Sequence, residues 1–317
     1  MNDSQIFSMH KILALDPDAI ESAEDWYRVY PFLGQAKGLF MANYPKKWIS
    51  KFLKIDVDAN EFSFWDQERI KQFLISLDAS YSFVSLNAPY DNNIDWASNY
   101  HKIGNRDISC IAFGRRGKAS GLKEIDQLDP SQLFIDTTVM KKFTPAGLAR
   151  ILSIFMRNSG KIAIVDRHNY LTKINGEVSP FVEFIREVLK DVKSSKCYEI
   201  LIYAKYDPDK YQYMNSSVLL YEKMSEVFSG FVTPLYGITY ICCAEYLNGN
   251  DLHARKILTN HAAFALSDSI AGKTYSQSVT RIHDQEYRNI NLKAWIDGEH
   301  GLDVKLSANL TNHIGAY

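Results

Sequence analysis

The apolar positions in the second half of the chain alternate between strand-like runs and helical spacing. Continuous apolar runs predict strands buried on both faces, because such strands need no polar side. These runs lie at residues 132–138, 161–166, 197–206, 236–246, 252–259 and 261–267. Apolar residues three and four positions apart predict helices between them, at residues 144–160, 179–193 and 215–230.

The predicted helices begin at residues that can cap them. Thr144 and Ser179 each precede a proline, which suits the first turn because the N–H it lacks would be unpaired there. Asn215 and Ser216 are the two candidate caps of the third helix. Strands that alternate with helices predict an α/β fold, a mixed sheet flanked by helices. The closely spaced strands from residue 236 onward predict antiparallel members near the end of the sheet.

The first part of the chain is less regular. Residues 1–60 are rich in aromatic side chains and predict no element. Helical spacing returns at residues 66–78, and further predicted elements follow as a strand at 81–87, a helix at 92–103 and a strand at 107–114.

A polar, glycine-containing segment at residues 114–131 predicts a long loop and a domain boundary. The 317 residues exceed the usual size of one hydrophobic core, which agrees with two domains. We therefore expect an aromatic-rich α/β region of unknown role at residues 1–131 and an α/β domain at residues 132–317.

Composition narrows the class of protein. The net charge of −1 excludes a basic field over the whole surface of the kind that nucleic-acid-binding proteins often carry, although a local basic patch is compatible with it. The four cysteines show no CxxC spacing or disulfide framework, so we expect a reduced, cytoplasmic chain. The N-terminus lacks a secretory signal pattern, and no window is long and apolar enough to predict a membrane span.

The segment DLHARKILTN, residues 251–260, contains the residue pair that most directly suggests a chemical function. Residues two apart on a strand face the same way, so a strand at 252–259 would present His253 and Arg255 side by side. Arginine offers fork-shaped donors for two phosphate oxygens, and histidine can act as nucleophile, acid or base near neutral pH. A strand histidine satisfied by a core hydrogen bond, with its arginine in an ion pair, is the alternative interpretation.

This segment resembles the second half of the phospholipase D superfamily signature, His-x-Lys followed after four residues by Asp. It is more similar to the divergent branch with His-x-Arg. The matching positions here are His253, Arg255 and Asn260, so arginine stands in place of lysine and asparagine in place of the carboxylate. The order of strands and helices over roughly residues 132–300 is also compatible with that fold.

The resemblance implies that His253, Arg255 and Asn260 bind a phosphodiester, for which nucleic acid is the leading candidate. His253 would be the nucleophile if the protein cleaves it, and no metal or cofactor is implied. Superfamily sites resemble two facing motifs, so a single copy implies either a homodimer or an inactive site. Divergent modules of this kind occur in bacterial defence proteins, which places a defence effector among the expected functions.

A second candidate site lies at strand ends, where Asp136 and Asp166 follow predicted strands and His168 lies close by. The carboxyl ends of strands line the ligand crevice of open α/β sheets, and two aspartates there could hold Mg²⁺ in a hydrolase. Aspartates also end strands simply by accepting backbone hydrogen bonds in the following turn.

Two basic segments complete the candidates. Arg115, Arg116 and Lys118 surround glycines and could bind phosphate, although a solvated loop has the same composition. The pair Lys46 and Lys47 precedes Trp48, a mixture that grips single strands of nucleic acid but that more often flanks a buried tryptophan.

The sequence also argues against several enzyme classes and allows one alternative role. Walker, GxGxxG, GxSxG and HExxH motifs are missing from the sequence, which argues against their enzyme classes. The aromatic N-terminal region favours, as an alternative function, a non-enzymatic subunit that docks a protein partner in a larger assembly.

Overall fold

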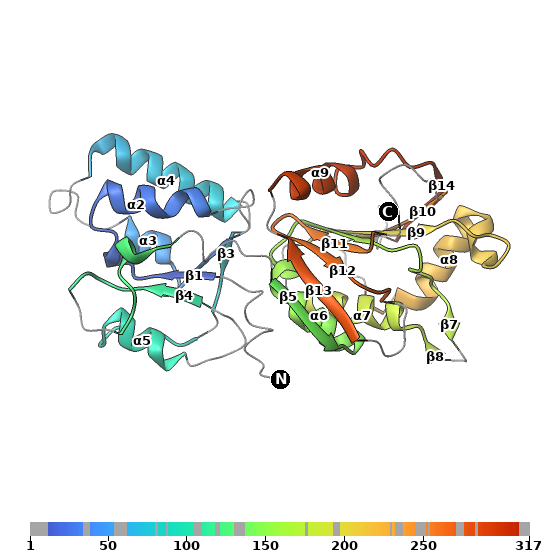
Figure 1. Cartoon of the computed structure of the whole chain (residues 1–317), viewed down its shortest axis with the longest axis horizontal. Helices are drawn as coiled ribbons and strands as arrows, with labels where there is room; N and C mark the ends of the chain where they lie inside the picture. Colours follow the sequence, from blue (N-terminus) through green and yellow to red (C-terminus); the bar gives the residue numbers. More distant parts are fainter. Residues whose placement is uncertain are drawn as a thin grey trace, which may run out of the picture. The chain divides into compact units, whose positions relative to one another are not determined.

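The chain divides into two compact units, Met1–Ile135 (unit 1) and Asp136–Tyr317 (unit 2), which are described separately (Figure 1). The computed structural model describes residues 12–33, 39–53, 62–79, 82–86, 88–103, 110–117, 121–129, 137–174, 177–192, 197–228, 230–231, 237–244, 252, 254–270, 276–282 and 285–310.

Unit 1 is built on a parallel sheet in the order β3-β2-β1-β4. Its strands are short: β1 (Ile12–Leu15), β2 (Phe40–Ala42), β3 (Phe83–Val84) and β4 (Cys110–Phe113). The helices between them are α2 (Ala23–Val29), α3 (Trp48–Phe52), α4 (Phe64–Ala79) and α5 (Trp96–Lys102), with 3₁₀ turns η1 (Pro17–Ala19), η2 (Tyr30–Phe32) and η3 (Ile125–Gln127).

The order of the strands explains where these helices lie. The chain steps from β1 to β2 to β3 in one direction and then returns to place β4 on the other side of β1. Because crossovers between parallel strands are right-handed, reversing the direction puts the next helix on the opposite face. Accordingly, α2, α3 and α4 cover one face and α5 the other (Figure 1). The first face packs around the buried side chains of Trp26, Trp48 and Leu74.

Unit 2 contains a mixed sheet in the order β14-β10-β9-β6-β11-β12-β13-β5. Its centre is parallel, and β11 begins the antiparallel part by pairing with β6. The strands are β5 (Thr137–Lys142), β6 (Lys161–Val165), β9 (Glu199–Lys205), β10 (Gly237–Cys243), β11 (Lys256–Thr259), β12 (Ala263–Leu266), β13 (Ser276–Ile282) and β14 (Val304–Leu310). A small separate hairpin joins β7 (Lys173–Ile174) to β8 (Glu177–Val178).

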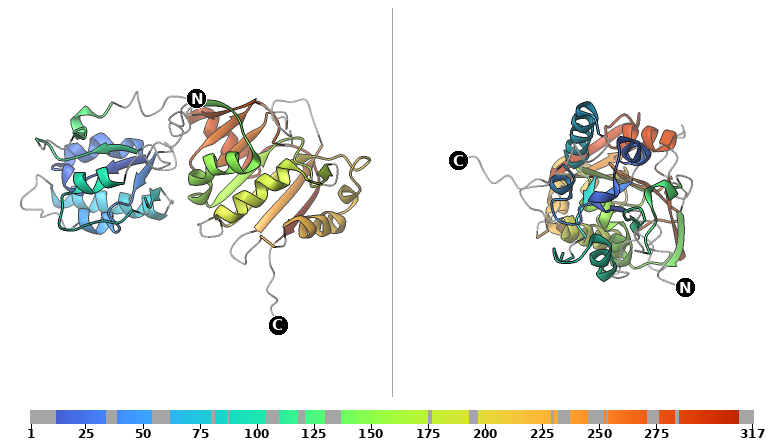
Figure 2. Two further views of the ribbon diagram at one scale, coloured as in Figure 1. Left: turned by 90° about the horizontal axis from the view of Figure 1, so that it is seen from below. Right: turned by 90° about the vertical axis from the view of Figure 1, so that its left-hand side faces the viewer.

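Helices cover both faces of this sheet (Figures 1 and 2). They are α6 (Pro145–Arg157), α7 (Pro180–Val192), α8 (Ser217–Phe228) and α9 (Gln285–Trp295), with the 3₁₀ turn η5 (Gln212–Asn215) before α8. On one face, Phe155 of α6 packs edge-on against Phe264, with ring centroids 5.0 Å apart. On the other, Trp295 of α9 packs in a buried cluster that includes Val165 and Ala263. Adjacent residues Ala263 and Phe264 thus face opposite helix layers, as the alternation of a strand requires.

The mixed sheet flanked by helices, with antiparallel strands near the end, confirms the predicted fold class. The caps also agree: Thr144 Oγ1 accepts a hydrogen bond from Gly147 N at 3.0 Å, and Ser179 Oγ accepts one from Val182 N at 3.2 Å. Of the two candidates for α8, Ser216 is the cap, because its Oγ accepts from Leu219 N. None of the helices that the structure describes is both long and apolar enough to cross a membrane.

Two predicted strands match the structure only in part. The strand expected at residues 252–259 begins only at Lys256, so it includes neither Leu252 nor Arg255, and His253 lies outside the described residues. The strand expected at 132–138 is described only as Thr137–Lys142, and residues 132–136 lie outside the described part. This β5 stands at the edge of the sheet, where lysines are common because they discourage pairing with another chain.

Candidate functional site

Arg255 directly precedes β11, and both its backbone and its side chain have partners in unit 2. Its carbonyl oxygen accepts a hydrogen bond from Leu266 N at 3.0 Å, which continues the pairing of β11 with β12. Its Nη1 donates to the carbonyl oxygen of Ser267 at 3.1 Å. Its Nε lies 4.0 Å from Oδ1 of Asp166. The guanidinium is therefore oriented by Asp166 and Ser267, which directly follow β6 and β12, the strands on either side of β11.

Asp166 follows the last residue of β6 and is 1% exposed. Its Oδ1 accepts a hydrogen bond from His168 N at 3.0 Å, as in the strand-ending turn that the sequence allows. Its Oδ2 and Nε of Arg255 are both buried and have no hydrogen-bond partner among the described residues. Buried polar atoms are rarely left unpaired, so this pair of atoms marks the place as incomplete.

The antiparallel pairing of β11 with β6 explains why these residues meet. Lys256, the first residue of β11, pairs with Val165, the last residue of β6. In an antiparallel pair, the residue before Lys256 lies opposite the residue after Val165, so Arg255 and Asp166 lie side by side. The structure thus joins residues from two candidate sites that the sequence analysis treats separately, and we call Asp166, His168, Lys210 and Arg255 the Arg255 site.

Burial and the charged groups of the Arg255 site shift the pKa of His168. Burial lowers the pKa of this imidazole from its ordinary value, because the charged form loses solvation. The negative charge of Asp166 opposes that shift, whereas the positive charges of Arg167, Arg255 and Lys210 add to it. The lowered pKa favours the neutral imidazole, and three of the four charged groups that act on it are cations.

Aromatic rings border the same site. The rings of Tyr170 and Tyr211 lie with their centroids 4.1 Å apart, and Nζ of Lys210 lies 5.3 Å from the centroid of Tyr211. Sequence reasoning missed these residues, although the segment YDPDKYQYM at 206–214 interleaves tyrosines with a lysine. That interleaving is the signal that could have found them.

Asn260 lies at the opposite end of β11 from Arg255. Its Oδ1 accepts a hydrogen bond from Lys161 N at 3.0 Å, where β6 begins. Strand residues rise by about 3.3 Å each, so the four residues of β11 keep Asn260 well away from Arg255. The expectation that the two act in one site does not match this placement. His253, the third predicted catalytic residue, lies outside the described residues.

The predicted Mg²⁺ site rests on Asp136, which lies outside the described part of the chain. Asp166, its expected partner, instead faces Arg255. Within the described ranges, no group of three or more His, Cys, Asp or Glu side chains is placed to hold a metal ion.

Arg115 and Arg116, predicted to bind phosphate, both contact carboxylates of unit 1. Arg115 forms an ion pair with Asp18, and its Nε lies 3.7 Å from Oδ2 of Asp16. Arg116 forms a bidentate pair with Asp25, its Nη1 lying 3.2 Å from Oδ2. Lys118 lies outside the described residues. Phosphate binding by this loop stays a prediction, and a phosphate would have to displace carboxylates from both guanidiniums.

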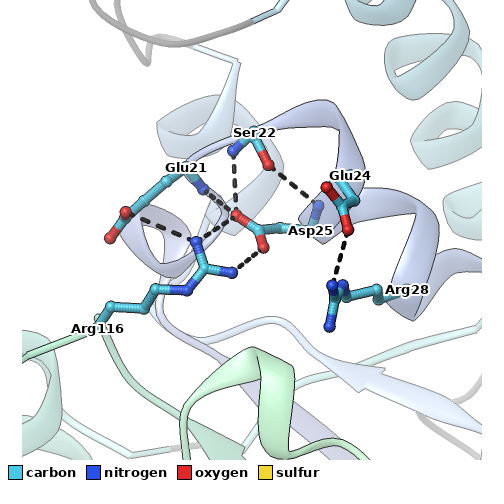
Figure 3. A network of polar contacts seen from close by, with 6 residues as sticks. All are labelled: Glu21, Ser22, Glu24, Asp25, Arg28 and Arg116. Carbon is cyan, nitrogen blue, oxygen red and sulfur yellow. Dashed lines mark hydrogen bonds and ion pairs between the residues drawn. The ribbon is translucent and has the colours of Figure 1, made fainter.

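The role of Arg116 is to hold the start of α2. Asp25 also accepts hydrogen bonds from the backbone N–H groups of Glu21 and Ser22, and Ser22 Oγ accepts one from Asp25 N (Figure 3). The Asp25 side chain is 2% exposed, so its charge depends on these contacts.

We expect Arg116→Met to lower the free energy of unfolding by about 1–2 kcal/mol, because it leaves the buried Asp25 charge without its cation. The matched control is Arg28→Met, whose ion pair with Glu24 is exposed and joins neighbouring helix turns. Urea unfolding of the two variants measures both effects. Equal stability of the two variants would contradict the assigned role of Arg116.

Comparisons with known proteins were made at the level of sequence and of fold. No family model and no curated protein matches the sequence. The fold is similar to that of Nuc, a phospholipase D family member from Salmonella typhimurium, with a TM-score of 0.33 and 9% identity over 54% of this chain and 99% of that one. TrmBL2, an archaeal chromatin protein with a novel mode of DNA binding, gives a TM-score of 0.29 and 10% identity over 82% of this chain and 70% of its own. Likenesses of this size assign neither a family nor an activity.

Proposed function

We propose that unit 2 binds a phosphodiester group of a nucleic acid at the Arg255 site. The proposal rests on the contacts and the exposure of the Arg255 guanidinium. Asp166 and the Ser267 carbonyl orient it, yet the side chain is 24% exposed. Its Nη2 donates no hydrogen bond to any residue that the structure describes. An oriented guanidinium with a donor to spare is suited to a phosphate oxygen.

The surrounding charge supports an anion as the ligand. Three cations, Arg167, Lys210 and Arg255, act on His168 against the one carboxylate of Asp166. Asp207 and Asp209 lie beside Lys210 in the sequence and offset part of this charge. The neutral imidazole of His168 can accept or donate a hydrogen bond without adding to the repulsion of a ligand cation.

Tyr170 and Tyr211 favour a nucleic acid over a small phosphate. Both rings are partly exposed, and Lys210 lies over them at 5.9 and 5.3 Å from their centroids. Cations that follow a backbone next to rings on which bases stack are the usual means of holding a single strand. We therefore propose that a single strand places a phosphate at Arg255 and a base near the tyrosines.

His253 enters the proposal through its neighbours in the chain. The carbonyl oxygen of Leu252 accepts a hydrogen bond from Arg167 N at 3.2 Å, so the residue before His253 lies against the loop that carries His168. In the proposed reaction, an imidazole nitrogen of His253 bonds to phosphorus as the P–O ester bond breaks. His253 of a second copy of this chain protonates the leaving oxygen, and water then hydrolyses the phosphohistidine.

Fluorescence anisotropy with a labelled single-stranded oligonucleotide tests the binding step. We expect Arg255→Met to weaken binding at least about tenfold and to reduce the slope of log K against log salt by about one. Arg28→Met, at an exposed position of unit 1, is the matched control and should bind like the wild type. Unchanged binding by Arg255→Met would refute the site.

Cleavage of the same oligonucleotide, followed on a denaturing gel, tests the chemistry. Cleavage that persists with a chelator and disappears in His253→Ala supports histidine chemistry, whereas loss with the chelator favours the Mg²⁺ alternative at Asp136 and Asp166. Binding without cleavage identifies an inactive phosphodiester-binding module. Sedimentation analysis reports whether the chain forms the homodimer that a shared site needs, and phage plaque counts test the proposed role in bacterial defence.

A second candidate function is docking of a protein partner by unit 1. Phe64 and Trp65, at the start of α4, are 68% and 72% exposed, which is unusual for such large rings. Tyr27 and Tyr30 of the neighbouring α2–η2 segment are also exposed. If this face, rather than the Arg255 site, carries the function, Trp65→Ala should abolish cellular function while Arg255→Met leaves it intact.

A further inference from the structure

Unit 1 contains a cavity of about 700 Å³ at the carboxyl end of its parallel sheet. Its walls come from the turn after β1, from α3, from the start of α5 with the segment before it, and from the loop after β4. The charged and polar lining includes Asp16, Asp18, Lys51, Asp95 and Arg115. This cavity lies in the other unit from the Arg255 site, so it is independent of the proposed function.

The strand order places this cavity where open α/β sheets bind ligands. The strand order reverses at β1, with β2 on one side of it and β4 on the other, and α2, which follows β1, and α5, which precedes β4, lie on opposite faces of the sheet. The strand ends are tied together, since Leu15 pairs with Phe113 and Asp16 N donates to the Phe113 carbonyl oxygen at 3.0 Å. The carboxyl ends of strands at such a reversal are where open α/β folds hold small molecules.

Asp16 is the buried polar group of the cavity. Its side chain is only 8% exposed. Its Oδ1 accepts a hydrogen bond from Asp18 N at 3.1 Å. Its Oδ2 accepts none from the described residues, and Nε of Arg115 lies 3.7 Å from it. A carboxylate oxygen of a largely buried side chain that lines a cavity, and that accepts no hydrogen bond from the described residues, is placed to receive one from a ligand.

The charges of the lining indicate the sign of that ligand. Three carboxylates, from Asp16, Asp18 and Asp95, face two permanent cations, from Lys51 and Arg115, which leaves one negative charge. Both cations already have partners: Arg115 pairs with Asp18, and Nζ of Lys51 lies 4.3 Å from the centroid of the Tyr90 ring.

The turn after β1 also disfavours phosphate. It reads Asp-Pro-Asp, so it offers carboxylates where dinucleotide-binding folds have a glycine-rich turn of open N–H groups. An anionic ligand would meet these carboxylates first.

We propose that this cavity binds a small organic cation, a molecule with a primary amine or guanidinium group whose charge is received by Asp16. The N–H donors of such a group match Oδ2 of Asp16, which accepts no hydrogen bond from the described residues, and its charge balances the lining. A volume of about 700 Å³ is in the range of small-molecule sites.

Binding should depend on pH through Asp16. Burial raises the pKa of Asp16 to about 6, with Asp95 adding to the shift and Arg115 and Lys51 opposing it. The groups that face it across the cavity are Asp18, Lys51, Tyr90, Asp95, His101 and Arg115. Because a cation prefers the ionised carboxylate, its affinity should be constant above pH 6 and fall toward about tenfold per pH unit below it.

Isothermal titration calorimetry of the full chain with agmatine, at pH 7.5 and pH 5, tests the proposal. We expect wild-type binding that weakens at pH 5, and Asp16→Asn should bind at least about tenfold more weakly at pH 7.5 with no pH dependence. Asp209→Asn, at an exposed position of unit 2, is the matched control. Arg255→Met should bind agmatine like the wild type, which separates this site from the proposed nucleic-acid site.

Several results would overturn the proposal. They are the absence of agmatine binding to the wild type, equal binding by Asp16→Asn, and displacement of agmatine by inorganic phosphate or Mg²⁺. Thermal unfolding of Asp16→Asn, followed by circular dichroism, shows that any loss of binding occurs in a folded protein.

Discussion

Replacing Trp48 with alanine is expected to lower the free energy of unfolding by about 3–5 kcal/mol, the largest effect among the variants considered. Trp48 is fully buried, and its indole Nε1 donates to the Leu15 carbonyl oxygen at 2.7 Å. Its ring stacks on Phe52 with centroids 5.0 Å apart. The substitution therefore leaves a cavity and an unpaired carbonyl oxygen at the end of β1.

Trp65→Ala is the matched control for Trp48→Ala, since both variants lose one indole ring from unit 1. Trp65 is 72% exposed, so its removal leaves no cavity and should change stability by less than about 0.5 kcal/mol. Urea unfolding monitored by circular dichroism measures both. If the two variants lost stability equally, the burial of Trp48 would be contradicted.

The second large effect is opposite in sign, because Asp16→Asn is expected to stabilise the protein at pH 8. The pKa of Asp16 rises from 3.8 to about 6 on folding, since burial disfavours its charged form. At about 1.4 kcal/mol per pKa unit, ionising this group in the folded protein costs about 3 kcal/mol. Asparagine removes that cost and also weakens the contact with Arg115, so we expect a net gain of about 2 kcal/mol.

The pH dependence gives the sign of this effect. A carboxyl group whose pKa is raised by folding contributes most to stability below its unfolded value, near pH 4. That contribution is lost as pH rises through the folded value, near pH 6. Wild type minus Asp16→Asn should therefore be small at pH 4 and most negative at pH 8. A difference that does not change between these two pH values would contradict the assigned pKa shift.

A gain in stability in Asp16→Asn would indicate that Asp16 serves ligand binding rather than stability. Groups that function at ligand sites often destabilise the folded protein, because they are buried there without the ligand that would pair with them. The same variant should therefore be more stable and bind agmatine less well.

The sequence predicts much of unit 2, because its signals act over a few neighbouring residues. The helix α6 follows from its apolar spacing and from Thr144, whose cap forms within a single turn. Unit 1 is harder to predict for the same reason. Its strands β1 and β2 have four and three residues, too few for a pattern to separate them from other buried segments. They become strands by pairing with each other.

The candidate site shows the same limit. The sequence places His253, Arg255 and Asn260 together because they are neighbours in the chain, but β11 carries Asn260 away to the start of β6. The partner of Arg255 that the structure describes is Asp166, from a different strand.

The sequence by itself determined the α/β class, the capped helices of unit 2 and the chemical character of Arg255. Only the tertiary structure decided that Arg255 meets Asp166, that Trp48 is buried while Trp65 is exposed, and that Asp16 lines a cavity. Helix spacing and caps depend on residues within one turn of each other. Strand register and burial depend on residues far apart in the chain, and their contacts have no local signature.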